Sequence, residues 1–127
     1  MPLFSSLAPE QLAHVARLAR IREAATGEKI VAQWTTSREF YVILGGSVDI
    51  LLDDELINRL RAGDFFGEFA ALDWAAGYTY PRLASVVASE PLRVLVFPEG
   101  TLNELVHEFP ALDAVIRTTL HERLPRR

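Results

Sequence analysis

The feature that most constrains this 127-residue chain is a series of short apolar segments between Gly27 and Phe97. Their side chains alternate with a period of two, as residues 47–52 show by placing Val48 and Ile50 on the same side of an extended chain. Glycine, aspartate and proline stand between the segments and interrupt them. Many short strands separated by such residues are typical of a closed or double-sheet β roll.

The pattern predicts six strands and the turns that join them. The glycine pair 45–46 is expected to form a tight hairpin turn, and the aspartate pair 53–54 a second turn. Glu90 and Pro91 separate the last two strands. The expected strands are residues 29–33, 39–44, 47–52, 56–61, 85–89 and 92–97.

Three segments outside these strands carry helical signals. Residues 8–21 begin with Pro9 and a glutamate, which suit a first helical turn, and continue with an apolar stripe that should pack on a sheet. Residues 99–107 and 110–123 form two helices on either side of a proline that ends one and starts the next. The expected fold is mainly β: a jelly-roll-like double-stranded β-helix with one N-terminal and two C-terminal helices.

The composition predicts a single domain covering residues 1–127. Half of the residues are hydrophobic and 24% are charged, which is typical of a folded globular chain. The net charge of −4 argues against direct contact with nucleic acid, and the absence of cysteine excludes disulfides and thiolate metal sites. No apolar run reaches the roughly twenty residues of a membrane span, and no signal-peptide pattern is present. We therefore expect a cytoplasmic location, either free or on the cytoplasmic face of a larger membrane protein.

The sequence offers neither catalytic nor metal-binding residues. The three histidines, His14, His107 and His121, fall in separate predicted helices without the spacing of metal ligands, so a metal-binding β roll of the cupin type would lack ligands on its strands. No serine or histidine lies in a nucleophile motif. The expectation is a protein that is not an enzyme and that needs no metal or cofactor.

Residues 63–85 indicate a binding function instead. The Gly-Asp pair 63–64 forms a turn, and Gly67 allows the backbone to approach a ligand before a short helical run, whose free N–H groups would bind an anion. Arg82, the only basic residue of this segment, would hold two phosphate oxygens with its guanidinium. The Glu68 carboxylate only accepts hydrogen bonds, so we expect it to receive one from a sugar hydroxyl. Taken alone, these residues also allow a plain turn with a solvated carboxylate.

An ordered series of motifs extends over nearly the whole chain. Its motifs are Phe4-x-x-Leu7, Gly27-Glu28-x-Ile30, Tyr41-x-Ile43-Leu44-x-Gly46-x-Val48, Leu60-x-x-Gly63-Asp64-x-Phe66, Phe66-Gly67-Glu68 and Pro81-Arg82-x-Ala84. This series resembles the cyclic nucleotide-binding domain of the catabolite activator protein family, of cyclic-nucleotide-dependent kinases and of cyclic-nucleotide-gated channels.

The resemblance implies a regulatory sensor that binds a cyclic nucleotide, with cAMP favoured over cGMP. Movement of the C-terminal helices would pass the signal to a neighbouring output domain that this chain lacks, and the last helix allows a homodimer. The residues that the resemblance assigns to the ligand are Phe66, Gly67, Glu68, Phe69, Ala70, Arg82, Leu83 and Ala84.

The chain departs from the family pattern at several points. Leu83 stands where nucleotide-binding members usually have a small or hydroxylated residue, and residues 69–81 are longer than the compact form of this segment. The aromatic side chains of this segment, Trp74 among them, would either stack on a purine or cover the outer surface. Residues 34–38 lack the usual Gly-Asp pair. The alternative function is therefore an interaction or dimerisation module that keeps the β roll without binding a nucleotide.

Overall fold

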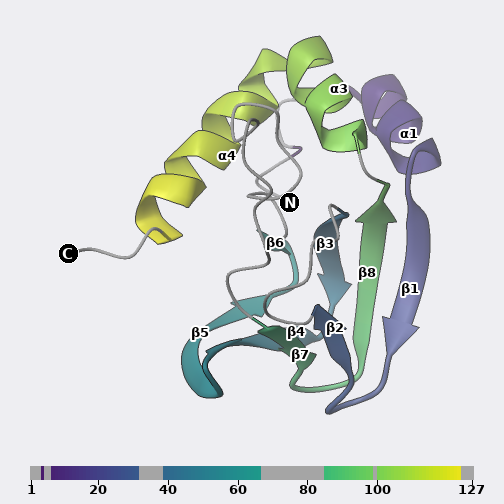
Figure 1. Cartoon of the computed structure of the whole chain (residues 1–127). Coiled ribbons are helices and arrows are strands. Elements are labelled where there is room, and N and C mark those ends of the chain that lie inside the picture. The colour runs from purple at the N-terminus through teal and green to yellow at the C-terminus, as the bar shows by residue number, and fades with distance from the viewer. Residues whose placement is uncertain (1–3, 5–6, 32–38, 67–84, 99, 124–127) are drawn as a thin grey trace.

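The protein, seen in a computed structural model, is described for residues 4, 7–31, 39–66, 85–98 and 100–123. These residues contain eight strands in two four-stranded antiparallel sheets, with orders β1-β8-β3-β6 and β2-β7-β4-β5 (Figure 1). The chain crosses repeatedly between the sheets, which is the connectivity of a β roll and confirms the predicted fold class. The strands are β1 (Arg20–Ala24), β2 (Lys29–Val31), β3 (Phe40–Gly45), β4 (Ser47–Leu52), β5 (Glu55–Arg61), β6 (Phe65–Phe66), β7 (Ser85–Ala88) and β8 (Leu92–Phe97).

Three helices lie together at one end of the strands in Figure 1: α1 (Pro9–Arg17), α3 (Thr101–Glu108) and α4 (Pro110–Arg123). Each contributes buried side chains to one cluster with the first sheet, which we call the helix-facing cluster. Burial of its apolar surface stabilises the attachment of the helices to the roll. The fully or nearly buried members of this cluster are Phe4, Val15, Phe40, Val42, Phe65, Phe97, Leu102, Leu105, Val106, Leu112 and Ile116.

The first helix is shorter than the sequence predicts. The pattern predicts a helix over residues 8–21, but α1 ends at Arg17, and Arg20–Ala24 form the unpredicted strand β1. This strand pairs with β8 in continuous antiparallel register, so its backbone hydrogen bonds are made to a distant segment rather than along a helix. Ile21, the last residue of the predicted helix, is 53% exposed on this edge strand. Pairing in three dimensions has overridden the local pattern.

The prediction of a hairpin at Gly45 and Gly46 is wrong. Strands β3 and β4 on either side belong to different sheets, so the two glycines form a corner between sheets and not a turn within one. Gly46 has φ +87°, and a Cβ there would collide with the carbonyl oxygen of Pro91 and lie 3.1 Å from the Cα of Leu92. Positive φ and close backbone contact both require glycine, which explains why the corner carries the residues of a hairpin.

The aspartate turn is confirmed. Asp53 and Asp54 have φ 51° and 65° and connect β4 to β5, which pair from Leu52 and Glu55 onward. Aspartate tolerates this left-handed conformation better than most residues do. Further along the same hairpin, the Nε of Arg59 donates to Asp49 Oδ1 at 2.7 Å, and this hydrogen bond raises the pKa of the Arg59 guanidinium.

Candidate functional site

The predicted ligand-binding segment, residues 67–84, connects the two sheets. It follows β6, at the edge of the first sheet, and precedes β7, which lies between β2 and β4 inside the second sheet. Of the eight predicted ligand-binding residues, Phe66 lies in the described part of the chain. The contacts of the others stay predictions, because those residues lie outside the described part: Gly67, Glu68, Phe69, Ala70, Arg82, Leu83 and Ala84.

The turn that leads into β6 is fixed by four backbone and side-chain hydrogen bonds. Gly63, with φ +95°, donates its N–H to the carbonyl of Ile43 at 2.9 Å, and the Ile43 N–H donates to the carbonyl of Asp64 at 2.9 Å. The Asp64 side chain accepts the N–H of Arg61 at 2.9 Å, and its own N–H donates to the Arg61 carbonyl at 2.9 Å. The predicted Gly-Asp turn is confirmed, and it ties the start of β6 to the middle of β3.

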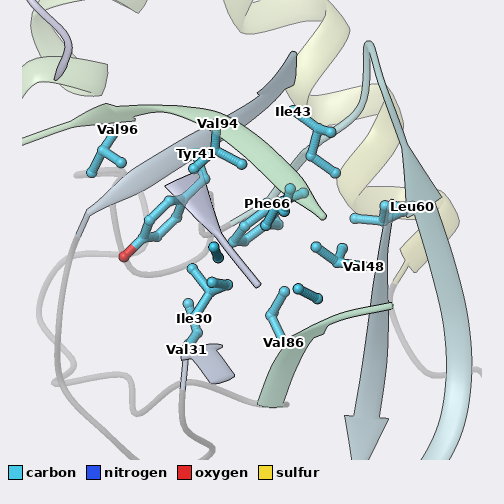
Figure 2. Close-up of a cluster of buried hydrophobic side chains, with 13 residues drawn as sticks. Ile30, Val31, Tyr41, Ile43, Val48, Leu60, Phe66, Val86, Val94 and Val96 are labelled. Atoms are coloured by element: carbon cyan, nitrogen blue, oxygen red, sulfur yellow. The ribbon is translucent and has the colours of Figure 1, made fainter. Parts of the chain in front are cut away.

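Phe66 lies inside the β roll, where its side chain is 4% exposed. It belongs to a second buried cluster, the roll cluster, formed between the two sheets (Figure 2). Its ring stacks on that of Tyr41, with centroids 4.7 Å apart and planes at 10°. The two residues are also cross-strand partners in the β3–β6 pair, so backbone and ring contacts act together. Members of the roll cluster are Ala24, Ile30, Val31, Tyr41, Ile43, Val48, Leu60, Phe66, Val86, Ala88, Leu92, Val94 and Val96.

Strand β6 contacts both clusters although it is two residues long. Phe66 points into the roll, while the neighbouring Phe65 belongs to the helix-facing cluster, where its ring lies 5.6 Å from that of Phe40. This alternation follows from the pleat of an extended chain, which directs successive side chains to opposite faces. The strand that precedes the predicted binding segment is therefore packed both against the roll interior and against the layer that contains α3 and α4.

The hydroxyl of Tyr41 reaches a polar group at the rim of the roll. In Figure 2 its oxygen points away from Phe66 and from the centre of the cluster. It donates to Glu39 Oε1 at 3.1 Å, and the other oxygen of that carboxylate accepts from Arg20 Nη2 at 2.9 Å. Sequence reasoning placed Tyr41 only in a strand motif, and the one available signal for this contact was a polar hydroxyl in an otherwise apolar run.

The described residues meet the requirements of neither a metal site nor a membrane-spanning helix. Within them, no group of three or more His, Asp or Glu side chains is placed to hold a metal ion. His14 and His107 lie on α1 and α3, and the Nε2 of His14 pairs with Glu108 at 3.6 Å instead of meeting another histidine. None of the helices described has both the length and the apolar character needed to cross a membrane.

Known proteins share both the sequence pattern and the fold. The cAMP-dependent protein kinase regulatory subunit of Mycosarcoma maydis is 30% identical over 115 residues, which cover 84% of this chain and 21% of that protein. The solved structure of the Thermus thermophilus catabolite activator protein superposes with a TM-score of 0.81 at 25% identity, covering 97% of this chain and 58% of that one. A regulatory subunit of a cAMP-independent protein kinase A from Trypanosoma brucei has the same fold, with a TM-score of 0.75 at 22% identity over 94% of this chain and 43% of that one.

The chain thus spans about a fifth of the fungal regulatory subunit that it matches. The family model of the cyclic nucleotide-binding domain matches residues 21–109, which is more than half of the chain. The matched range includes both motifs of the predicted binding segment, Phe66-Gly67-Glu68 and Pro81-Arg82-x-Ala84. With the two-sheet roll, the three helices and the Gly-Asp turn also in place, the chain belongs to the cyclic nucleotide-binding domain family.

Proposed function

We propose that this regulatory domain binds cAMP in preference to cGMP at the segment that joins β6 to β7. The observation that carries the proposal is the ordered pair of motifs Phe66-Gly67-Glu68 and Pro81-Arg82-x-Ala84 within the matched range. The similarity to a regulatory subunit named for its dependence on cAMP supports the choice of nucleotide. The proposed ligand-binding residues are those predicted from the sequence, with Phe66 as their anchor in the roll.

Arg82 is the residue that would neutralise the cyclic phosphate, because the segment 67–84 contains no other basic side chain. Glu68 would accept the ribose 2′-hydroxyl, a role that predicts weaker binding of the 2′-deoxy analogue. Leu83 presents no hydroxyl to the exocyclic amino group of guanine. An unmet buried donor costs about 1 to 3 kcal/mol, which is the physical basis for expecting cAMP to bind more tightly than cGMP.

The experiment is calorimetric titration of the 127-residue chain with cAMP, cGMP and 2′-deoxy-cAMP. We expect binding of cAMP, weaker binding of the other two, and a loss of roughly 2 to 5 kcal/mol in Arg82→Ala, as for other buried charge pairs. Arg59→Ala is the matched control, since Arg59 is an exposed arginine on β5 that pairs with Asp49. Equal affinity of the wild-type chain and a folded Arg82→Ala variant for cAMP would contradict the proposed site.

Signalling would proceed through the C-terminal helices. Phe65 and Phe66 are adjacent in the chain yet belong to different clusters. A shift of β6 on ligand binding would therefore change the packing of Phe65 against the helix-facing cluster, to which α3 and α4 contribute. A ligand can move those helices only if it binds one of their arrangements more tightly than the other. The recipient would be a neighbouring output domain or a second copy of the chain.

A second candidate is an interaction module that does not bind a nucleotide. One observation favours it: Leu83 departs from the family pattern. Thermal unfolding with cAMP, cGMP and cyclic or linear dinucleotides separates the two candidates. A ligand that binds only the folded state raises the unfolding temperature, whereas no shift with any nucleotide would favour the interaction module.

A further inference from the structure

Four residues of the first sheet lie directly opposite one another across its four strands. Arg20 on β1 pairs with Val96 on β8, Val96 pairs with Tyr41 on β3, and Tyr41 pairs with Phe66 on β6. Val96, Tyr41 and Phe66 all belong to the roll cluster, so the row follows the inner face of the sheet. It runs from the edge strand that follows α1 to the opposite edge strand, which precedes the predicted binding segment.

Polar contacts at the rim fix the orientation of the aromatic ring in the middle of this row. Tyr41 is 2% exposed, and its hydroxyl donates at 3.1 Å to Glu39 Oε1. Glu39 is in turn paired with Arg20 through Oε2 at 2.9 Å, at the beginning of the same row. This hydrogen bond fixes the position of the phenol oxygen and with it the direction of the long axis of the ring. The Tyr41 ring is thereby held at its hydroxyl end, at the rim of the roll.

The position of the Tyr41 ring matters because Tyr41 is the stacking partner of Phe66. In the described part of the chain, β6 consists of Phe65 and Phe66, which pair with Val42 and Tyr41. The nearly parallel contact of the two rings, at 10°, constrains the χ angles of Phe66 and through them its backbone.

We infer that Tyr41, oriented by Glu39 and Arg20, is a positioning residue for nucleotide binding: it sets the place of Phe66, the first residue of the ligand site. This inference rests on the proposed function, because the ligand is the cyclic nucleotide proposed above. Tyr41 acts on the ligand site through Phe66, and Glu39 orients Tyr41 through the hydrogen bond to its hydroxyl. The opposite face of β3 has a different role. There Phe40 packs in the helix-facing cluster, with its ring tilted by 48° to that of Phe65 and by 42° to that of Phe97.

The test uses variants that keep the ring and remove only its anchor. Tyr41→Phe retains the stacking surface and loses the hydrogen bond, and Glu39→Gln weakens the acceptor. We expect each to raise the Kd for cAMP roughly three- to tenfold, the range of one lost hydrogen bond. The effects of the two substitutions on the Kd should be less than additive, because both act on the hydrogen bond between the Tyr41 hydroxyl and the Glu39 carboxylate. Asp49→Asn is the control, because it weakens the hydrogen bond that Arg59 donates to Asp49 between β5 and β4, away from β6, and should change the Kd by less than about twofold.

A ligand-free measurement separates this inference from the proposed function. Hydrogen exchange should become faster in peptides that contain β6 in Tyr41→Phe, with the β4–β5 hairpin unchanged, because only one edge of the first sheet is released. If the wild-type chain binds no cyclic nucleotide while β6 exchange still rises, the proposed function fails and Tyr41 is shown to fix only the strand. An unchanged Kd with unchanged β6 exchange would overturn the inference, as would exchange that rises equally in every strand.

Discussion

The roll cluster and the helix-facing cluster share strand β3 but are built from different side chains. Between the sheets, aliphatic residues surround one nearly parallel ring pair, Tyr41 and Phe66. On the helix side, the phenylalanines of the sheet meet at tilted angles and are covered by leucines of α3 and α4. The roll cluster consists of strand residues whose strands are hydrogen-bonded to one another, whereas the helix-facing cluster depends on side-chain packing of α1, α3 and α4 against the sheet. We therefore expect the first to persist when the second is damaged.

The largest effect should come from Phe97→Ala in the helix-facing cluster. Phe97 is fully buried and contacts the ring of Phe40 with centroids 5.8 Å apart. Removing a buried phenyl ring should lower the free energy of unfolding by about 3 to 5 kcal/mol. Urea denaturation measures the loss, and hydrogen exchange should show α3 and α4 opening before β4 and β5. Simultaneous opening of all strands and helices would show that the two clusters form a single cooperative unit.

The two clusters also differ in how far the sequence predicted them. Strands β4 and β8 have the predicted bounds, because alternation and flanking turn residues are local signals. The run Phe40–Ile43 is apolar at every position, and only the fold shows that its side chains alternate between two cores. Strand β1 and the two-residue β6 were missed, since pairing with distant strands defines both.

The next effect concerns the corner where the chain passes between sheets. In Gly46→Ala the new methyl group would collide with the Pro91 carbonyl, and the backbone at φ +87° is unfavourable for any residue with a Cβ. Backbone strain of this kind costs about 1 to 3 kcal/mol. Gly27→Ala is the control, because Gly27 has the same φ but a Cβ added there would have no atom within 4 Å. Equal losses in unfolding free energy would mean that backbone strain, and not the contact with Pro91, determines the cost.

A matched pair of smaller substitutions compares the two clusters directly. Ile43 in the roll and Ile116 on α4 are both 0% exposed. Ile→Val at either position should lower the unfolding free energy by about 0.5 to 1.5 kcal/mol. We expect only Ile116→Val to speed hydrogen exchange in α4, since that helix is attached through the helix-facing cluster. Faster exchange of α4 in Ile43→Val as well would show that packing changes pass through β3.

The sequence alone predicts the chemistry of the binding segment, but it does not predict the contacts that hold the strand before that segment. The chemistry of Glu68 and Arg82 follows from residue type, because a carboxylate accepts hydrogen bonds and a guanidinium binds phosphate oxygens. The stacking of Tyr41 on Phe66 depends on the register of β3 with β6, which no local pattern contains. Similarly, the bond from Tyr41 to Glu39 joins residues two apart whose side chains share a face only once the strand is formed.

The smallest effect is expected at the surface of α4, outside both clusters. The Nε of Arg117 donates to Asp113 Oδ2 at 2.9 Å across one helical turn, with both side chains partly exposed. Such i,i+4 pairs stabilise a helix by about 0.2 to 0.5 kcal/mol. A double-mutant cycle of Asp113→Asn and Arg117→Gln isolates this coupling from the favourable position of Asp113 in the first helical turn. The coupling should shrink in 1 M salt, where screening acts within about 3 Å. A coupling above about 1 kcal/mol would contradict the view that apolar burial, and not surface charge, attaches α4 to the roll.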